Sequence, residues 1–109
     1  EPWMVQAALY KGPMLRHFDV SMITSPRFQK FALDIAQKYN SPCQESVRSG
    51  GGTDAGMIHT EGIPCIVIGI PVRYIHSSNC FCTLDDYQNA VNLAEKIVLN
   101  LNEEVLASF

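Results

Sequence analysis

The sequence predicts an α/β fold in which a layered sheet is flanked by helices. Extended and helical segments alternate along its 109 residues, in the order strand, helix, strand, short helix, buried strand, loop and helix. Such alternation is typical of a sheet whose strands are joined by right-handed crossovers. The length accommodates a single domain over residues 1–109, and a hydrophobic content of 47% is enough for one core.

The first half of the chain predicts two strands separated by a helix. Residues 13–19 alternate between two sets of side chains, which favours a strand at the edge of the sheet. Ser25 and Pro26 are typical of a helix start, because the hydroxyl can cap the first turn and the first helical residue does not need an N–H. Apolar residues then recur every three or four positions as far as Tyr39, and residues 43–47 form the second strand.

The stretch from Ser49 to Ser78 organises the rest of the chain. Three successive glycines at 50–52 precede a short helix that begins at Thr53 or Asp54. Glycine is needed where the backbone turns through positive φ or is approached closely. The segment from Pro64 to Ile70 is almost continuously apolar, which predicts a buried strand covered on both faces in a parallel or mixed sheet.

A loop that carries Arg73, Tyr74 and His76 follows this strand. Ligands of open α/β sheets collect outside the carboxyl ends of the strands, so the glycine turn and this loop are predicted to meet at one edge. A neutral imidazole is the commonest transition-metal ligand, which makes His76 the candidate metal ligand. From its position alone, a surface or hydrogen-bonded histidine is an equal alternative.

Neighbouring polar residues each have more than one interpretation. Asp54 is either a helix cap, a carboxylate bonded to backbone amides in the glycine turn, or a carboxylate that orients a metal-ligating histidine through its other ring nitrogen. Arg73 either binds a carboxylate or steadies the loop. His59 on the short helix is expected to pack or to support a ligand rather than to be a ligand itself. His17 with Asp19, and Glu103 with Glu104, form pairs that superficially match metal or base motifs, but their surroundings favour ordinary strand and exposed helix positions.

A long helix is predicted to close the chain. Thr83 and Asp86 have the spacing of a capping box in which aspartate replaces the more usual glutamate. Apolar residues at helical spacing from Tyr87 to Val105 then predict a helix of about five turns.

Composition excludes several classes of protein. The net charge is −3 without a cluster of Lys or Arg, which argues against a nucleic-acid binder. No apolar run reaches the roughly 20 residues of a spanning helix, and no segment resembles a signal peptide, so a cytoplasmic protein that does not bind membranes is expected. A chain that starts at Glu1 is expected to be a processed product, an expressed piece or part of a longer protein.

The four cysteines are predicted to be reduced and to behave as small hydrophobes. Cys43 and Cys65 lie in extended apolar segments, whereas Cys80 and Cys82 are closer together than the cysteines of structural zinc sites usually are. A metal or redox role of the second pair is the alternative.

The motifs GGTDAG at residues 51–56 and RYIHS at 73–77, followed by LDDYQNAVNLAEKIV, closely resemble the C-terminal part of the M42 family of metallo-aminopeptidases. The sequence from Lys11 to Pro42 is also similar to sequences of that family. The resemblance implies an α/β catalytic domain that carries two divalent metal ions, usually zinc or cobalt, and that is interrupted by an inserted dimerisation domain. It also implies hydrolysis of N-terminal residues from peptides and a homo-oligomeric parent protein.

Carried over by motif, the resemblance assigns one metal ligand to this chain, His76. Gly51, Gly52, Thr53 and Asp54 would support the wall of the site, with Arg73 in the loop beside it. Asp19 matches a family aspartate on the strand before the first helix, not a metal ligand. The family's other ligands and its catalytic glutamate lie upstream, so a C-terminal fragment that is inactive alone is expected. A stand-alone, non-catalytic α/β module for binding or assembly is the alternative.

Overall fold

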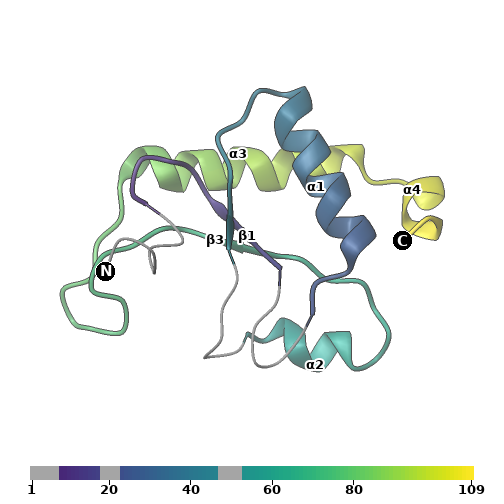
Figure 1. Ribbon diagram of the computed structural model, residues 1–109, viewed down its shortest axis with the longest axis horizontal. Coiled ribbons are helices and arrows are strands. Elements are labelled where there is room, and N and C mark those ends of the chain that lie inside the picture. Colours follow the sequence, from purple (N-terminus) through teal and green to yellow (C-terminus); the bar gives the residue numbers. More distant parts are fainter. Residues whose placement is uncertain (1–7, 18–22, 47–52) are drawn as a thin grey trace.

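The computed structural model describes residues 8–17, 23–46 and 53–109, and within these ranges it has one mixed sheet and four helices (Figure 1). The predicted α/β class is therefore confirmed. In chain order the elements are β1 (Met14–Arg16), α1 (Pro26–Lys38), β2 (Gln44–Ser46), α2 (Ala55–His59), β3 (Val67–Gly69), α3 (Leu84–Asn100) and α4 (Glu103–Ala107).

The three strands lie in the order β2-β1-β3, with β1 parallel to β2 and antiparallel to β3. Leu15 pairs with Glu45 on one side and with Ile68 on the other. The prediction that this strand lies at the edge of the sheet is therefore wrong. Its alternation reflects two different faces of a central strand, since Leu15 is fully buried while its neighbours Met14 and Arg16 are half-buried.

Helix α1 begins and ends where local sequence predicts. The Ser25 hydroxyl accepts a hydrogen bond from the Phe28 amide, and Pro26 is the first helical residue. At the other end Asn40 adopts a φ of 52°, and the Ser41 amide donates to the Ala36 carbonyl at 2.8 Å. Both signals act within a few residues, which is why they can be read directly from the chain.

Helix α3 starts as predicted but ends earlier. The Thr83 hydroxyl accepts from the Asp86 amide at 3.0 Å, which is one half of the predicted capping box. The helix stops at Asn100, because Leu101 and Asn102 are extended and the Asn102 side chain caps a new helix by accepting from the Val105 amide at 2.9 Å. The prediction of one helix through Val105 is therefore wrong at its C-terminal end.

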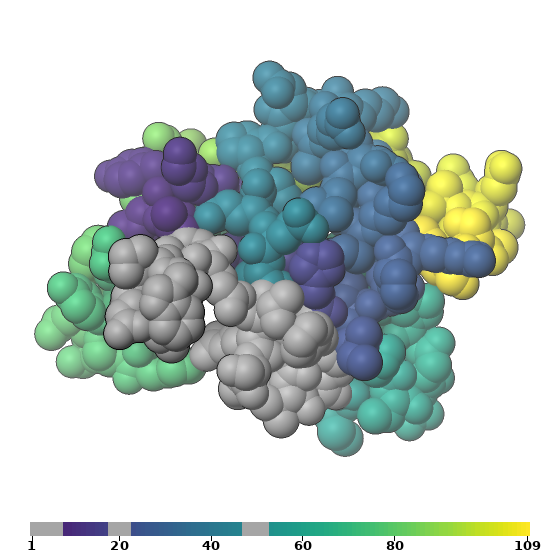
Figure 2. All heavy atoms as spheres, viewed as in Figure 1, coloured from purple at the N-terminus to yellow at the C-terminus, as the bar shows by residue number. Residues whose placement is uncertain are grey.

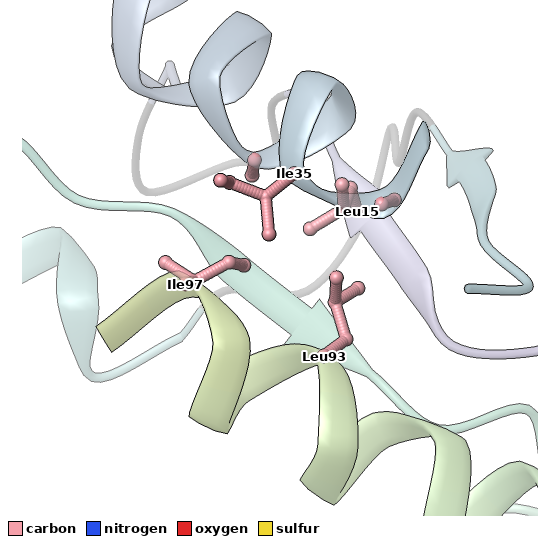
Figure 3. Close-up of a cluster of buried hydrophobic side chains, with 6 residues drawn as sticks. Leu15, Ile35, Leu93 and Ile97 are labelled. Carbon is pink, nitrogen blue, oxygen red and sulfur yellow. The ribbon is translucent and has the colours of Figure 1, made fainter. Parts of the chain in front are cut away.

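The buried core lies on one face of the sheet, between the strands and helices α1 and α3 (Figure 3). Leu15 points from β1 toward Ile35 of α1 and toward Leu93 and Ile97 of α3. Ile68 of β3 packs against the same cluster. We call this side of the sheet the closed face.

The opposite side, which we call the open face, carries Met14, Arg16 and Gly69. Strand β3 is only three residues long and every residue in it is half-buried. The prediction of a strand from Pro64 to Ile70 that is buried on both faces is therefore wrong for this structure. Ile66 and Ile68 pack against the core on the closed face, whereas Gly69 and Ile70 border a groove.

Among the described helices, none is both long enough and apolar enough to cross a lipid bilayer.

Candidate functional site

The predicted ligand His76 lies in a loop whose two ends pair with each other. We call residues 73–81 the His76 loop. The Arg73 amide donates to the Phe81 carbonyl at 2.8 Å, and the Phe81 amide donates back to the Arg73 carbonyl at 3.2 Å. Next to this pair, the rings of Tyr74 and Phe81 meet edge to face with centroids 5.9 Å apart. The loop thus has a defined base, although its side chains are exposed.

The tip of the His76 loop has a strained backbone. Tyr74 and His76 have φ values of 58° and 65°, in the left-handed region that histidine tolerates better than tyrosine. The Tyr74 carbonyl accepts from both the amide and the hydroxyl of Ser77, at 3.2 and 2.6 Å. Such strain concentrates at functional sites, where surrounding structure imposes it. The turn therefore holds His76 at an exposed position from which its ring is accessible.

The predicted site-supporting residues before α2 are only partly described. Gly51 and Gly52 lie outside the described residues. Asp54 occupies the cap position of α2, but it is exposed and its side chain makes no capping hydrogen bond. The prediction that the Asp54 side chain caps α2 is therefore wrong, whereas its predicted alternative, hydrogen bonds to amides of the glycine turn, involves residues outside the described ranges. Its role toward a metal-ligating histidine stays a prediction, as does the role of Thr53.

Strand direction corrects the prediction that the two candidate loops leave the sheet at one edge. Because β3 is antiparallel to β1, its last residue Gly69 pairs with Met14, whereas the last residue of β2, Ser46, pairs with Arg16. The carboxyl ends of β2 and β3 consequently lie at opposite ends of the sheet. In Figure 2 the green residues that follow β3 and the teal residues of α2 lie on opposite sides of the view.

The described residues do not by themselves fit a metal centre, since no group of three or more His, Cys, Asp or Glu among them could hold an ion. The His17 ring instead lies 2.8 Å from the Glu45 carboxylate, and Asp19 lies outside the described ranges. Glu103 and Glu104 are exposed on the first turn of α4, as predicted. His76 would thus need partners from elsewhere to bind a metal, because affinity depends on several converging ligands.

The four cysteines are free thiols in two environments. Cys43 and Cys65 are half-buried, and burial, with a further contribution from Glu45, raises the pKa of the Cys43 thiol. Cys80 and Cys82 are exposed on either side of Phe81. The interpretation as small hydrophobes therefore fits the first pair and is wrong for the second.

A groove of about 590 Å³ runs along the open face beside the His76 loop. One wall is formed by Ala8 and Leu9, the floor by Met14 and Arg16, and the other wall by residues 69–73 with Ile75. Most of these side chains are apolar, and both charged ones are arginines. The groove therefore suits a mostly apolar occupant.

Two polar side chains, half-buried Gln44 and fully buried Asp86, hold the first wall of the groove in place. The Gln44 amide binds the Ala8 backbone through two hydrogen bonds of 2.9 Å and the Gly12 carbonyl at 2.8 Å. The fully buried Asp86 carboxylate accepts from the amides of Tyr10 and Gly12, at 2.8 and 3.0 Å. Burial acts to raise the pKa of Asp86, but hydrogen bonds from Tyr10, Thr83 and Gly12 outweigh burial and lower it.

Sequence reasoning identified Asp86 only as a helix-capping residue and did not single out Gln44. The Asp86 contacts join residues 76 and 74 positions apart, so no local pattern could have indicated them. Gly12 is a local indication of a turn, because its φ of 90° requires glycine. The sequence does not show that the amide of Gly12 donates to Asp86.

Comparison with known proteins decides the family. The profile of the M42 glutamyl aminopeptidase family matches residues 3–93. The chain belongs to the M42 peptidase family. It is 37% identical over 101 residues to the glutamyl aminopeptidase of Lactococcus lactis subsp. cremoris, and 35% identical over 96 residues to the lysyl aminopeptidase of Pyrococcus furiosus.

Solved M42 structures share the fold described above. The TET aminopeptidase of a marine sediment thaumarchaeote matches 92% of this chain with a TM-score of 0.87 and 38% identity. An aminopeptidase of Desulfurococcus kamchatkensis matches 99% of it with a TM-score of 0.94 and 33% identity. The predicted resemblance and the partial M42-type fold are thus confirmed.

This M42 chain spans less than a third of the length of its relatives. The match to the Lactococcus enzyme covers 91% of this chain but 28% of that protein, and the match to the Pyrococcus enzyme covers 27% of that protein. The two structures are likewise matched over 29% and 32% of their chains. Most of the length of these relatives thus has no counterpart in the 109 residues.

Proposed function

We propose that this chain is the C-terminal part of the catalytic domain of a metal-dependent M42 aminopeptidase, and that it contributes the ligand His76 to a centre of two divalent ions, zinc or cobalt. The proposal rests chiefly on the family match together with the strained, accessible position of His76. The complete enzyme would remove N-terminal residues from peptides in the cytoplasm. Alone, the chain would be inactive, since its described residues contain no group of three or more side chains that could hold a metal ion.

Residues around the proposed metal centre would hold the site in shape without binding the metal. Gly51, Gly52, Thr53 and Asp54 would form a wall of the site, and Arg73 would fix the base of the His76 loop. A Pyrococcus horikoshii relative, TET1, assembles into a tetrahedron or a large octahedral shell, which supports a homo-oligomeric parent enzyme here. In all of these roles, His76 remains the proposed metal ligand of this chain.

Metal binding and turnover of the 109-residue chain test the proposal. Incubation with cobalt or zinc should give no turnover of aminoacyl p-nitroanilides, and cobalt absorption should show no tight site. When the chain is fused behind the unmatched portion of the Lactococcus glutamyl aminopeptidase, cobalt binding should appear and His76→Ala should reduce it at least tenfold.

His59→Ala provides the matched control, because His59 is a histidine of the described structure that we place outside the metal centre. This variant should bind cobalt like the parent fusion. Robust turnover by the isolated chain that His76→Ala abolishes would contradict the fragment assignment, and equal effects of the two substitutions would contradict the role of His76.

A second candidate function is a stand-alone, non-catalytic α/β module for binding or assembly. The open face of the sheet and its groove favour this alternative, because an uncovered apolar surface is typical of an interaction site. A metal-free, monodisperse monomer in gel filtration would support it over the enzyme fragment, which should aggregate or be rescued by its missing part.

A further inference from the structure

We propose that Cys80 and Cys82 form a binding site for a soft monovalent metal ion of the Cu(I) class, which their two thiolates hold together. The pair lies at the C-terminal end of the His76 loop. The site uses neither His76 nor any other residue of the metal centre proposed above, so it stands or falls independently of the proposed function.

The first argument is that these two thiols are available to a ligand. Cys43 and Cys65 are half-buried, and each of their thiols donates to a backbone carbonyl in its own segment, at 3.6 and 3.3 Å. Cys80 and Cys82 are exposed, and within the described part of the chain no hydrogen bond engages either thiol. Metal binding at this pair therefore displaces no contact of the fold.

The second argument is that both thiols lie on the same side of an extended segment. Phe81, between the two cysteines, exchanges hydrogen bonds of 2.8 and 3.2 Å with Arg73 in an antiparallel bridge. Side chains alternate in direction along an extended segment, so Cys80 and Cys82 both leave the side opposite the Phe81 ring. That ring packs edge to face against Tyr74 with centroids 5.9 Å apart, which anchors the segment from the other side.

The spacing of the pair favours a bound ion over a disulfide bond. Residues two positions apart in an extended segment have Cα atoms about 6.6–6.8 Å apart. This separation is at the upper end of the range of about 4.4–6.8 Å that disulfides span. A thiolate lies about 2.3 Å from a bound ion, so two thiolates on one ion can be as much as about 4.6 Å apart, whereas disulfide sulfurs are about 2 Å apart. The extended segment therefore suits an ion between the two sulfurs better.

The number of ligands identifies the class of ion. Structural zinc takes four ligands, whereas no group of three or more His, Cys, Asp or Glu within residues 8–17, 23–46 and 53–109 could hold an ion. Two thiolates suffice for a soft ion of low coordination number, and thiolate sulfur is a ligand that selects Cu(I). Binding releases both thiol protons, because the thiolate is the ligand, and it involves no change of oxidation state.

Titration of the reduced 109-residue chain with Cu(I) tests the site. Ascorbate under nitrogen keeps the ion reduced, and competition with the coloured Cu(I) chelator bicinchoninate gives the Kd. The chain should bind one ion tightly. Cys80→Ser and Cys82→Ser should each raise the Kd at least about a hundredfold, because two linked ligands typically gain this much over one. The double variant should bind little more weakly than either single variant.

Cys65→Ser is the matched control, because its thiol lies outside the His76 loop. It should change the Kd less than twofold, and circular dichroism should show equal urea midpoints for the parent and all variants. Binding by independent thiols would overturn the site, since each single substitution would then lower the number of bound ions and leave the Kd unchanged. A tight Zn(II) site lost in the same two variants would overturn the two-ligand assignment. A disulfide between Cys80 and Cys82 in the chain purified under air, found by mass spectrometry, would refute the argument from spacing.

Discussion

The two faces of the sheet differ in how deeply their side chains are buried. On the closed face Leu15 is fully buried among Ile35, Leu93 and Ile97. One residue away on the same strand, Met14 borders an open groove. Apolar residues line both faces, and in the described part of the chain helices α1 and α3 pack on the first. The difference shows that the stability of the fold depends more on Leu15 than on Met14, because the Leu15 side chain is fully buried.

Substitution of Leu15 should produce the largest effect. Leu15→Ala removes a fully buried side chain at the centre of the core and leaves a cavity, which typically costs about 3–5 kcal/mol. The free energy of unfolding, measured by urea denaturation, should fall by this amount or the chain should fail to fold.

Met14→Ala is the matched control on the open face. Its side chain is half-buried beside the groove, so truncation should cost less than about 1 kcal/mol in the isolated chain. Equal losses for Leu15→Ala and Met14→Ala would contradict the distinction between the two faces.

Asp86→Asn should produce the next largest effect, because this residue fixes a wall of the groove from within the folded interior. The variant keeps the size of the side chain but loses the charge that accepts from the Tyr10 and Gly12 amides. Hydrogen bonds to charged groups contribute about 1.5–3 kcal/mol each, so urea denaturation at pH 7 should show a loss of about 3 kcal/mol.

The pH dependence of this difference gives an independent check. The pKa of Asp86 is lower in the folded chain than its usual value, so its contribution is complete above the unfolded pKa of about 3.9. It is lost as the pH falls from there toward the folded pKa. The stability difference between parent and Asp86→Asn should therefore shrink as the pH falls below about 4, and a constant difference would contradict this role.

Local signals made much of the fold predictable. Ser25 and Thr83 cap helices through amides three residues away, so both helix starts follow from short stretches of sequence. Strand direction is different, because the antiparallel pairing of β1 with β3 depends on contacts between residues about fifty positions apart. The same limit applies to the site. The exposed position of the His76 loop was predictable, but the separation of the carboxyl ends of β2 and β3 was not.

Gly12→Ala should have a smaller effect at the junction of the groove wall and β1. The backbone there has a φ of 90°, and a new Cβ would lie 2.7 Å from the Pro42 carbonyl carbon and oxygen. Backbone strain and overpacking together should lower the free energy of unfolding by about 2 kcal/mol. Gly62→Ala is the control, since Gly62 has a φ of 79° but open space around it, and should cost about half as much.

Gln29→Leu should have the smallest effect and the opposite sign. Gln29 is 3% exposed on α1, and among the described residues neither its side-chain nitrogen nor its oxygen has a hydrogen-bond partner. A buried amide without partners costs free energy that an apolar side chain of similar size does not. Urea denaturation should show a gain of about 1 kcal/mol, whereas the exposed Gln37→Leu on the same helix should change stability by less than about 0.5 kcal/mol. A loss of stability for Gln29→Leu would mean that the Gln29 amide forms a hydrogen bond in solution. The closed face would then contain a polar contact in addition to its apolar core.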